Sequence, residues 1–167
     1  GFVNNNLAFV CGANINSTDN KTRLLKWDGN SFTELFIEFP TGNNQPIGPI
    51  YTFSENEVWF CGTSEDVVKY DGMKFEYFDL DSGYKVIPVF KVANQVFCAA
   101  FKTYIDSSFT YSKTMMNIYE FQLDNWILKF SDTTESGGNY YFPAPFGTLV
   151  NNNMYARLSS TLYEFTG

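Results

Sequence analysis

The stretch NEVWFCGTSEDVVKYDGMKFEYFDL, from Asn56 to Leu80, decides the fold of this chain. One apolar run follows Asn56, a second ends at the aromatic residue Tyr70, and a third follows the dipeptide Asp71-Gly72. Short apolar runs separated by turn residues predict antiparallel β-strands. Asp-Gly favours a two-residue type I′ hairpin, because both of its central residues need positive φ. The stretch therefore predicts three strands of one meandering sheet.

The same pattern occurs four times in the 167 residues. The first strand of each copy follows an asparagine, and these asparagines are Asn6, Asn56, Asn94 and Asn152. The second strand of each copy ends in an aromatic residue that follows a charged one, and these aromatic residues are Trp27, Tyr70, Phe121 and Phe165. A period of roughly 40 to 50 residues with several short strands in each unit is typical of β-propellers. A β-sandwich also uses short strands, but it does not predict four copies in register.

We therefore predict an all-β chain with about four β-propeller blades, each a four-stranded antiparallel sheet. The expected blades lie at about residues 1–47, 48–85, 86–143 and 144–167 of one partial propeller domain, 1–167. The fourth copy ends at Gly167, directly after its third strand. This predicts that the ring is incomplete and that the chain is an excerpt of a longer propeller of about six to eight blades.

The second copy also has a recognisable signature. Asn56-Glu-Val-Trp-Phe-Cys-Gly62, followed by Val68-Lys-Tyr-Asp-Gly72 and Phe75, resembles the N-x-V-W-x-x-G…Y-D-G-x-x-W blades of secreted and surface propellers, which are loosely related to kelch and BNR-like propellers. The first copy has Phe9 in place of the tryptophan, and the third and fourth copies lack Asp-Gly. Trp27-Asp28 is also similar to WD40 repeats, but the chain has no histidine for the Gly-His half of that signature. The resemblance implies a secreted or cell-surface scaffold and no catalytic residue.

Composition limits the classes of function. The net charge of −7, with only 11 Lys and Arg, disfavours nucleic acid and anionic membranes as partners. No stretch approaches the roughly 18 apolar residues of a membrane span, so we expect no membrane insertion. Histidine, the commonest general base and metal ligand, is absent, and the three cysteines contain no Cys-x-x-Cys pair. We therefore expect no enzymatic activity, no cofactor and no metal site, with the cysteines as small apolar core residues.

The expected binding residues come from long connections on one face of the propeller disc. Because strands alternate in direction, the connections from the second to the third strand of a blade and from one blade to the next lie on this face. These connections are residues 13–22, 38–47, 101–115 and 131–143. Loops held by a rigid scaffold concentrate binding residues, and aromatic side chains stack on sugars or anchor protein partners. The aromatic candidates are Tyr104, Phe109, Tyr111, Tyr140 and Tyr141. In the alternative interpretation, the aromatic residues of 101–111 extend the neighbouring strands as a protruding hairpin and pack on one another.

The sequence thus predicts a non-catalytic protein-interaction or scaffold module whose partner is a protein. Two alternatives stay open. One is a carbohydrate-binding or glycosidase-like propeller of a secreted or surface protein, and the other is a purely structural subunit of a large assembly.

Overall fold

Strands make up all the regular structure in the part of the chain that the structure describes. The computed structural model describes residues 1–12, 22–37, 49–61, 65–80, 83–107, 111–137, 147–150, 153–158 and 161–165. These residues form fifteen strands and no helix, and all strand pairs are antiparallel. The all-β prediction is therefore confirmed. In the described part of the chain, no helix has the length and apolar character needed to cross a membrane.

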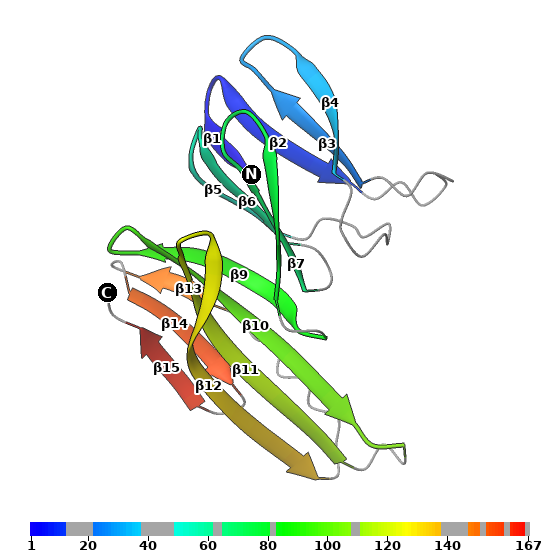
Figure 1. The fold of residues 1–167 in the computed structure, drawn as a ribbon, viewed down its shortest axis with the longest axis vertical. Helices are drawn as coiled ribbons and strands as arrows, with labels where there is room; N and C mark the ends of the chain where they lie inside the picture. Colours follow the sequence, from blue (N-terminus) through cyan, green and yellow to red (C-terminus); the bar gives the residue numbers. More distant parts are fainter. Residues whose placement is uncertain are drawn as a thin grey trace. The chain divides into compact units, whose positions relative to one another are not determined.

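The strands form four sheets, and the chain runs through each sheet from one strand to its neighbour (Figure 1). The first sheet contains β1 (Phe2–Asn4), β2 (Leu7–Gly12), β3 (Thr22–Trp27) and β4 (Phe32–Ile37). The second contains β5 (Ile50–Ser54), β6 (Glu57–Cys61), β7 (Asp66–Tyr70) and β8 (Phe75–Asp79). The third contains β9 (Lys85–Val92), β10 (Gln95–Ile105), β11 (Tyr111–Gln122) and β12 (Asn125–Gly137). The fourth contains β13 (Gly147–Val150), β14 (Asn153–Leu158) and β15 (Thr161–Phe165).

The chain divides into two units, Gly1–Ser82 and Gly83–Gly167, and each unit contains two sheets. Alternate residues of a strand point to opposite faces of its sheet. We call face A of the first sheet the one that carries Leu7, Phe9, Leu24 and Ile37. Face B is the opposite one, and face B of the second sheet carries Val58, Phe60, Val68, Tyr70 and Phe75. These two faces form the hydrophobic core of the first unit.

Aromatic contacts hold this core together. The Phe9 ring meets the rings of Phe60 and Tyr70, each edge-on and with centroids 5.5 Å apart. Lys26, also on face A, donates a hydrogen bond of 2.8 Å from Nζ to the Tyr70 hydroxyl. Its ammonium lies 5.0 Å from the centre of the same ring, at a distance where a cation–π interaction contributes. Face A of the first sheet therefore has a specific partner in face B of the second.

Of the equivalent strands β2 and β6, only β6 is buried on both of its faces. Val58, Trp59, Phe60 and Cys61 are all fully buried. In β2, Phe9 is buried, whereas Val10 on the opposite face is 50% exposed. Among the described residues, a sheet covers face A of the first sheet only, and this difference decides the burial of β2.

In the second unit, face A of the third sheet packs on the fourth sheet. The core on this face contains Phe90, Val92, Ala99, Phe101, Met116 and Ile118. Phe130 of β12 meets Tyr163 of β15 with ring centroids 5.1 Å apart, and the Tyr163 hydroxyl donates to Asp132. Tyr163 aligns with Val68, which lies on face B of the second sheet. Both units therefore stack face A of the earlier sheet on face B of the later one.

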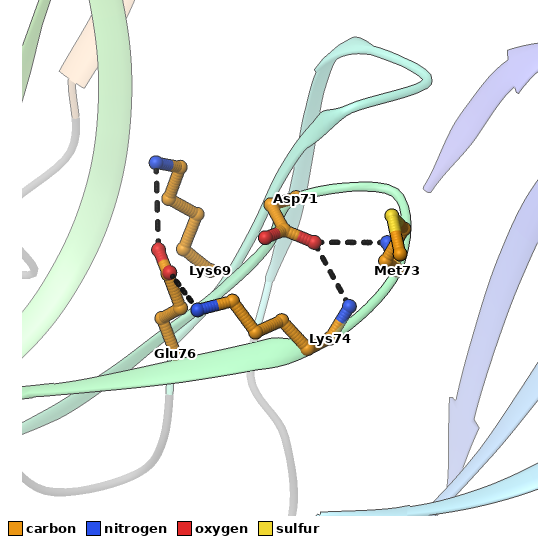
Figure 2. Close-up of polar contacts among 5 residues, drawn as sticks. All are labelled: Lys69, Asp71, Met73, Lys74 and Glu76. Atoms are coloured by element: carbon orange, nitrogen blue, oxygen red, sulfur yellow. Dashed lines mark hydrogen bonds and ion pairs between the residues drawn. The ribbon is translucent and has the colours of Figure 1, made fainter.

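The Asp-Gly turns differ from the predicted two-residue hairpin. Tyr70 pairs with Phe75, so residues 71–74 form a four-residue loop. Asp71 Oδ1 accepts hydrogen bonds of 2.8 Å from the backbone N–H groups of Met73 and Lys74 (Figure 2). These bonds stabilise the carboxylate and lower the pKa of Asp71. Only the glycine has positive φ, at 98°, so the predicted type I′ turn is wrong here.

Asp28 closes the corresponding loop of the first sheet in the same way, with bonds of 2.9 and 2.8 Å from the N–H groups of Asn30 and Ser31. Positive φ at both central residues, as a type I′ turn requires, occurs instead at two hairpins of the third sheet that contain no glycine. Ala93 and Asn94 have φ of 47° and 68°, and Leu123 and Asp124 have φ of 48° and 59°. Each pair lies between directly paired strand residues, so each forms a two-residue loop.

Candidate binding surface

The strands of the third sheet are longer than the repeat predicts. β10 continues to Ile105, which pairs with Ser112, and β11 continues the ladder to Tyr111, which pairs with Gly137 of β12. Residues 101–105 and 111–115 are therefore strand and not loop, as are residues 131–137. The expected loops are wrong at these positions, and the alternative of a hairpin that extends the strands is the one observed there.

Only one of the five predicted residues has a described side chain. Tyr104 lies within the extended part of β10, opposite Lys113, and is 48% exposed. Tyr111 is the first residue of β11, but its side chain is not among those described. Phe109, Tyr140 and Tyr141 lie outside the described residues. The structure therefore brings Tyr104 to an exposed strand surface and leaves the other four as predictions.

Lys102 is the neighbour of Tyr104 that the sequence analysis missed. Its ammonium lies 5.2 Å from the centre of the Tyr104 ring and 5.6 Å from that of Tyr84. Both distances are within the range of cation–π attraction. Lys102 and Tyr104 share a face because they are two positions apart on one strand. The spacing of Lys-x-Tyr in an alternating segment is a signal that could have identified this pair.

The turn that leads into β9 fits closely around Lys102. Gly83 has φ of 82°, which side chains rarely adopt, and a Cβ there would lie 3.1 Å from Lys102 Nζ. Tyr84 follows it, and its hydroxyl lies 4.0 Å from Sδ of Met115, the residue that pairs with Lys102 across the strands. The glycine thus allows the turn to approach the lysine stem, and Tyr84 limits where the ammonium can move.

Charged residues continue the same face across the ladder. Lys113 pairs with Tyr104 on one side and with Glu135 on the other, and its Nζ lies 3.7 Å from Glu135 Oε1. We call the face formed by Lys102, Tyr104, Lys113, Met115 and Glu135 the extension surface. Its charged members are Lys102, Lys113 and Glu135, and the chain as a whole has a net charge of −7. The extension surface therefore combines charged side chains of both signs with the exposed aromatic ring of Tyr104.

This arrangement of side chains suits the binding of a partner more than catalysis. Within the described ranges, no three metal-ligating side chains lie together in a group that could hold an ion. The three cysteines form no disulfide, and burial raises the pKa of the Cys61 thiol far above its usual value. A thiol kept protonated in this way is a poor nucleophile. Stacking, cation–π contact and charge pairing are the interactions that the extension surface offers.

No family model matches this chain, and a search of curated proteins also found no match.

Proposed function

We propose that this chain is a non-catalytic protein-interaction module that binds a segment of a partner protein on the extension surface. The observation that carries the proposal is the exposed ring of Tyr104 beside the ammonium of Lys102 on a continuous three-stranded ladder. Tyrosine is enriched among residues that dominate binding energy at interfaces. Because the strands are fully paired at this point, the ring is presented by a rigid backbone and binding requires little ordering.

The charges of the extension surface indicate the chemistry of the partner. Lys102 and Lys113 are the cationic groups with which acidic side chains of a partner would pair, and Lys113 also lies 3.7 Å from Glu135 Oε1. An acidic segment with one apolar or aromatic residue would place that residue on Tyr104 and its carboxylates near the two ammonium groups. Binding should then weaken as salt is raised, because the lysines are partly exposed and their attraction is screened.

We further propose that the four sheets are blades of a β-propeller. The support is the repeated meander, three times with four strands, and the repeated stacking of face A on face B within each unit. In a propeller, the first strand of each blade lies nearest the axis and the last lies farthest from it. Spin labels at Asn5 and Ala93, next to first strands, should therefore be closer together than labels at Asn30 and Leu123, next to last strands. Equal or reversed distances in pulsed electron paramagnetic resonance would exclude the propeller arrangement.

The binding proposal is tested with a displayed library of random peptides selected on the immobilised chain. Enriched peptides are synthesised with a fluorophore, and their Kd is measured by anisotropy. We expect Tyr104→Ala to weaken binding about tenfold or more, and Lys102→Ala to weaken it less and to reduce the salt dependence. Leu123→Ala is the matched control, since this residue is 94% exposed on a hairpin loop of the same sheet.

Two results would count against the binding proposal. Peptides that bind Tyr104→Ala as tightly as the original chain would show that the extension surface is not the site. Selection that enriches no peptide, together with binding to a glycan array that Tyr104→Ala abolishes, would favour a carbohydrate ligand for the same ring.

A further inference from the structure

We propose that the partner segment binds as an added β-strand along residues 103–105 of β10, an inference that rests on the proposed function and states how the segment is held. The ladder between β9 and β10 ends at the pair Lys85–Phe101, whereas β10 continues beside β11 to Ile105 (Figure 1). On the side of β10 away from β11, no described strand pairs with residues 103–105. All of these strands belong to the second unit, Gly83–Gly167. We call this side of residues 103–105 the open edge.

The backbone groups of Thr103 and Ile105 point to the open edge. Val92 and Gln95 flank the two-residue loop between β9 and β10, and the residue after such a loop turns its backbone N–H to the residue before it. The backbone groups of Gln95 therefore lie on the β9 side, and this direction alternates along an antiparallel strand. Because the register of β10 with β11 is unbroken up to Ile105, Thr103 and Ile105 also direct their N–H and C=O groups to the β9 side.

The end of β10 differs from that of the equivalent strand in the second sheet. There, Cys61 is the last residue of β6, pairs with Val67 of β7, and donates its backbone N–H to Pro49 O at 3.3 Å. β6 thus has a neighbour on both sides up to its last residue. A strand with outward N–H and C=O groups is a template for pairing with another chain. Strand addition uses these main-chain groups for affinity and alternate side chains for specificity.

The side chains around the open edge indicate which residues the added strand carries. Its residue opposite Tyr104 would lie on the extension surface, where an apolar or aromatic side chain gains a cross-strand contact with the Tyr104 ring. The residues on either side of it would lie on the opposite face, beside Thr103 and Ile105, and Ile105 is 38% exposed there. β-Branched residues suit these two positions. The expected centre of the segment is therefore an aromatic or apolar residue between two β-branched ones.

Tyr84 marks one end of the open edge. It precedes Lys85, so it lies level with Lys102 of β10, and its ring centre is 5.6 Å from Lys102 Nζ. An added strand therefore ends beside Thr103 in this direction. An acidic residue at this end of the segment would lie near the Lys102 ammonium, which agrees with the chemistry of the proposed partner.

Hydrogen exchange of the full chain, followed residue by residue by nuclear magnetic resonance, tests the open edge. In the free chain, we expect the amides of Thr103 and Ile105 to exchange about tenfold or more faster than those of Lys102 and Tyr104, which face β11. A saturating amount of a peptide enriched on the immobilised chain should slow the first two amides about tenfold. Slow exchange of Thr103 and Ile105 in the free chain would overturn the proposal, because the edge would already be covered. Unchanged exchange of these two amides in the complex would overturn it as well.

Thr103→Pro and Thr103→Val form a matched pair of variants. Proline has no backbone N–H and is accepted on a strand where that group faces away from the sheet. Both variants lose the hydroxyl that lies 3.2 Å from that of Thr114, but only Thr103→Pro also loses the N–H. We expect Thr103→Pro to weaken peptide binding about tenfold and Thr103→Val to change it less than about twofold. Equal Kd values for the two folded variants would overturn strand addition.

N-methylation of the peptide, one backbone amide at a time, tests the same geometry without changing the protein. Strand addition predicts that binding is lost at alternate residues of the segment, because only every second N–H faces β10. Loss without this alternation, or no loss at any residue, would overturn the inference. If Tyr104→Ala weakens binding in that case, the proposed function stands and only strand addition fails. If no peptide is enriched, or if Tyr104→Ala has no effect, both proposals fail.

Discussion

Leu123 occupies a backbone conformation that disfavours leucine, and its replacement by asparagine should stabilise the third sheet. Its φ is 48°, and its side chain is 94% exposed. The left-handed region costs most residues roughly 1 to 2 kcal/mol, whereas asparagine adopts it readily and is preferred in type I′ hairpins. Because the leucine packs against little, its removal loses almost no buried area. We expect Leu123→Asn to raise the free energy of unfolding by about 1 kcal/mol.

Urea denaturation and hydrogen exchange measure this gain. With an m-value of about 2 kcal/mol per molar urea, the transition that involves the third sheet should shift by about 0.5 M. Exchange of the amides of β11 and β12 that open with the sheet should slow about fivefold. Met73→Asn is the control, since Met73 is 92% exposed and its φ is not among the positive ones. It should leave stability within about 0.5 kcal/mol. Equal effects of Met73→Asn and Leu123→Asn, or a loss of stability with the latter, would refute the argument from backbone strain.

Three other substitutions test contacts elsewhere. Gly72→Ala should destabilise the first unit by about 2 kcal/mol in urea unfolding, since φ is 98° and the new Cβ would overlap Asn56 Oδ1. Adding Asn56→Ala should restore part of this stability. No restoration would show that the overlap is unimportant. Desolvation, followed by repulsion from Asp66 directly opposite, raises the pKa of Asp79. The contribution of Asp79 to stability is therefore greatest below its pKa in the unfolded state and falls as pH rises through its pKa in the folded state. Asp79→Asn should then stabilise the fold by about 0.5 kcal/mol at pH 7 and not at pH 3. An equal gain at both pH values would contradict this. The Lys129 ammonium, 2.7 Å from Glu120 Oε2, and a hydrogen bond from Gln122 lower the pKa of Glu120. Its contribution is therefore present above the unfolded pKa and lost as pH falls, and Glu120→Ala should cost about 2 kcal/mol at pH 7, whereas an unchanged urea midpoint would show that the pair contributes nothing.

The repeat in the sequence predicted the strands because its signature residues touch one another. The asparagine before the second strand of a sheet lies against the glycine after the third strand. In the second sheet, the place of a Cβ on Gly72 is 3.5 Å from Asn56 Cα, and in the first sheet that of Gly29 is 3.2 Å from Asn6 Cα. Any larger residue than glycine would separate the two turns. The glycine that follows the third strand is thus a packing requirement in the first and second sheets, and this is why the Asn and Asp-Gly signature identifies these two sheets.

Turn type and strand length were harder to predict because they depend on competing local interactions. Asp-Gly favours a two-residue turn, but the carboxylate of Asp71 also binds two backbone amides, and this requires a four-residue loop. In the third sheet, the long ladder imposes a tight hairpin on Leu123, whose own preference opposes the left-handed conformation it adopts there. The same ladder converts 101–105 from expected loop to strand, because each added residue gains cross-strand partners. One of these partners is the Thr103–Thr114 hydroxyl pair, at 3.2 Å.

The burial of a strand residue depends on which sheet covers it, and no strand sequence contains that information. Val10 and Phe60 occupy the same position in equivalent strands, yet one is 50% exposed and the other fully buried. Both residues are apolar because both faces of such a sheet are of the type that stacks on another sheet. Both positions are apolar, so the difference in their burial follows from the sheet that covers Phe60 and not from the residues of the strands themselves.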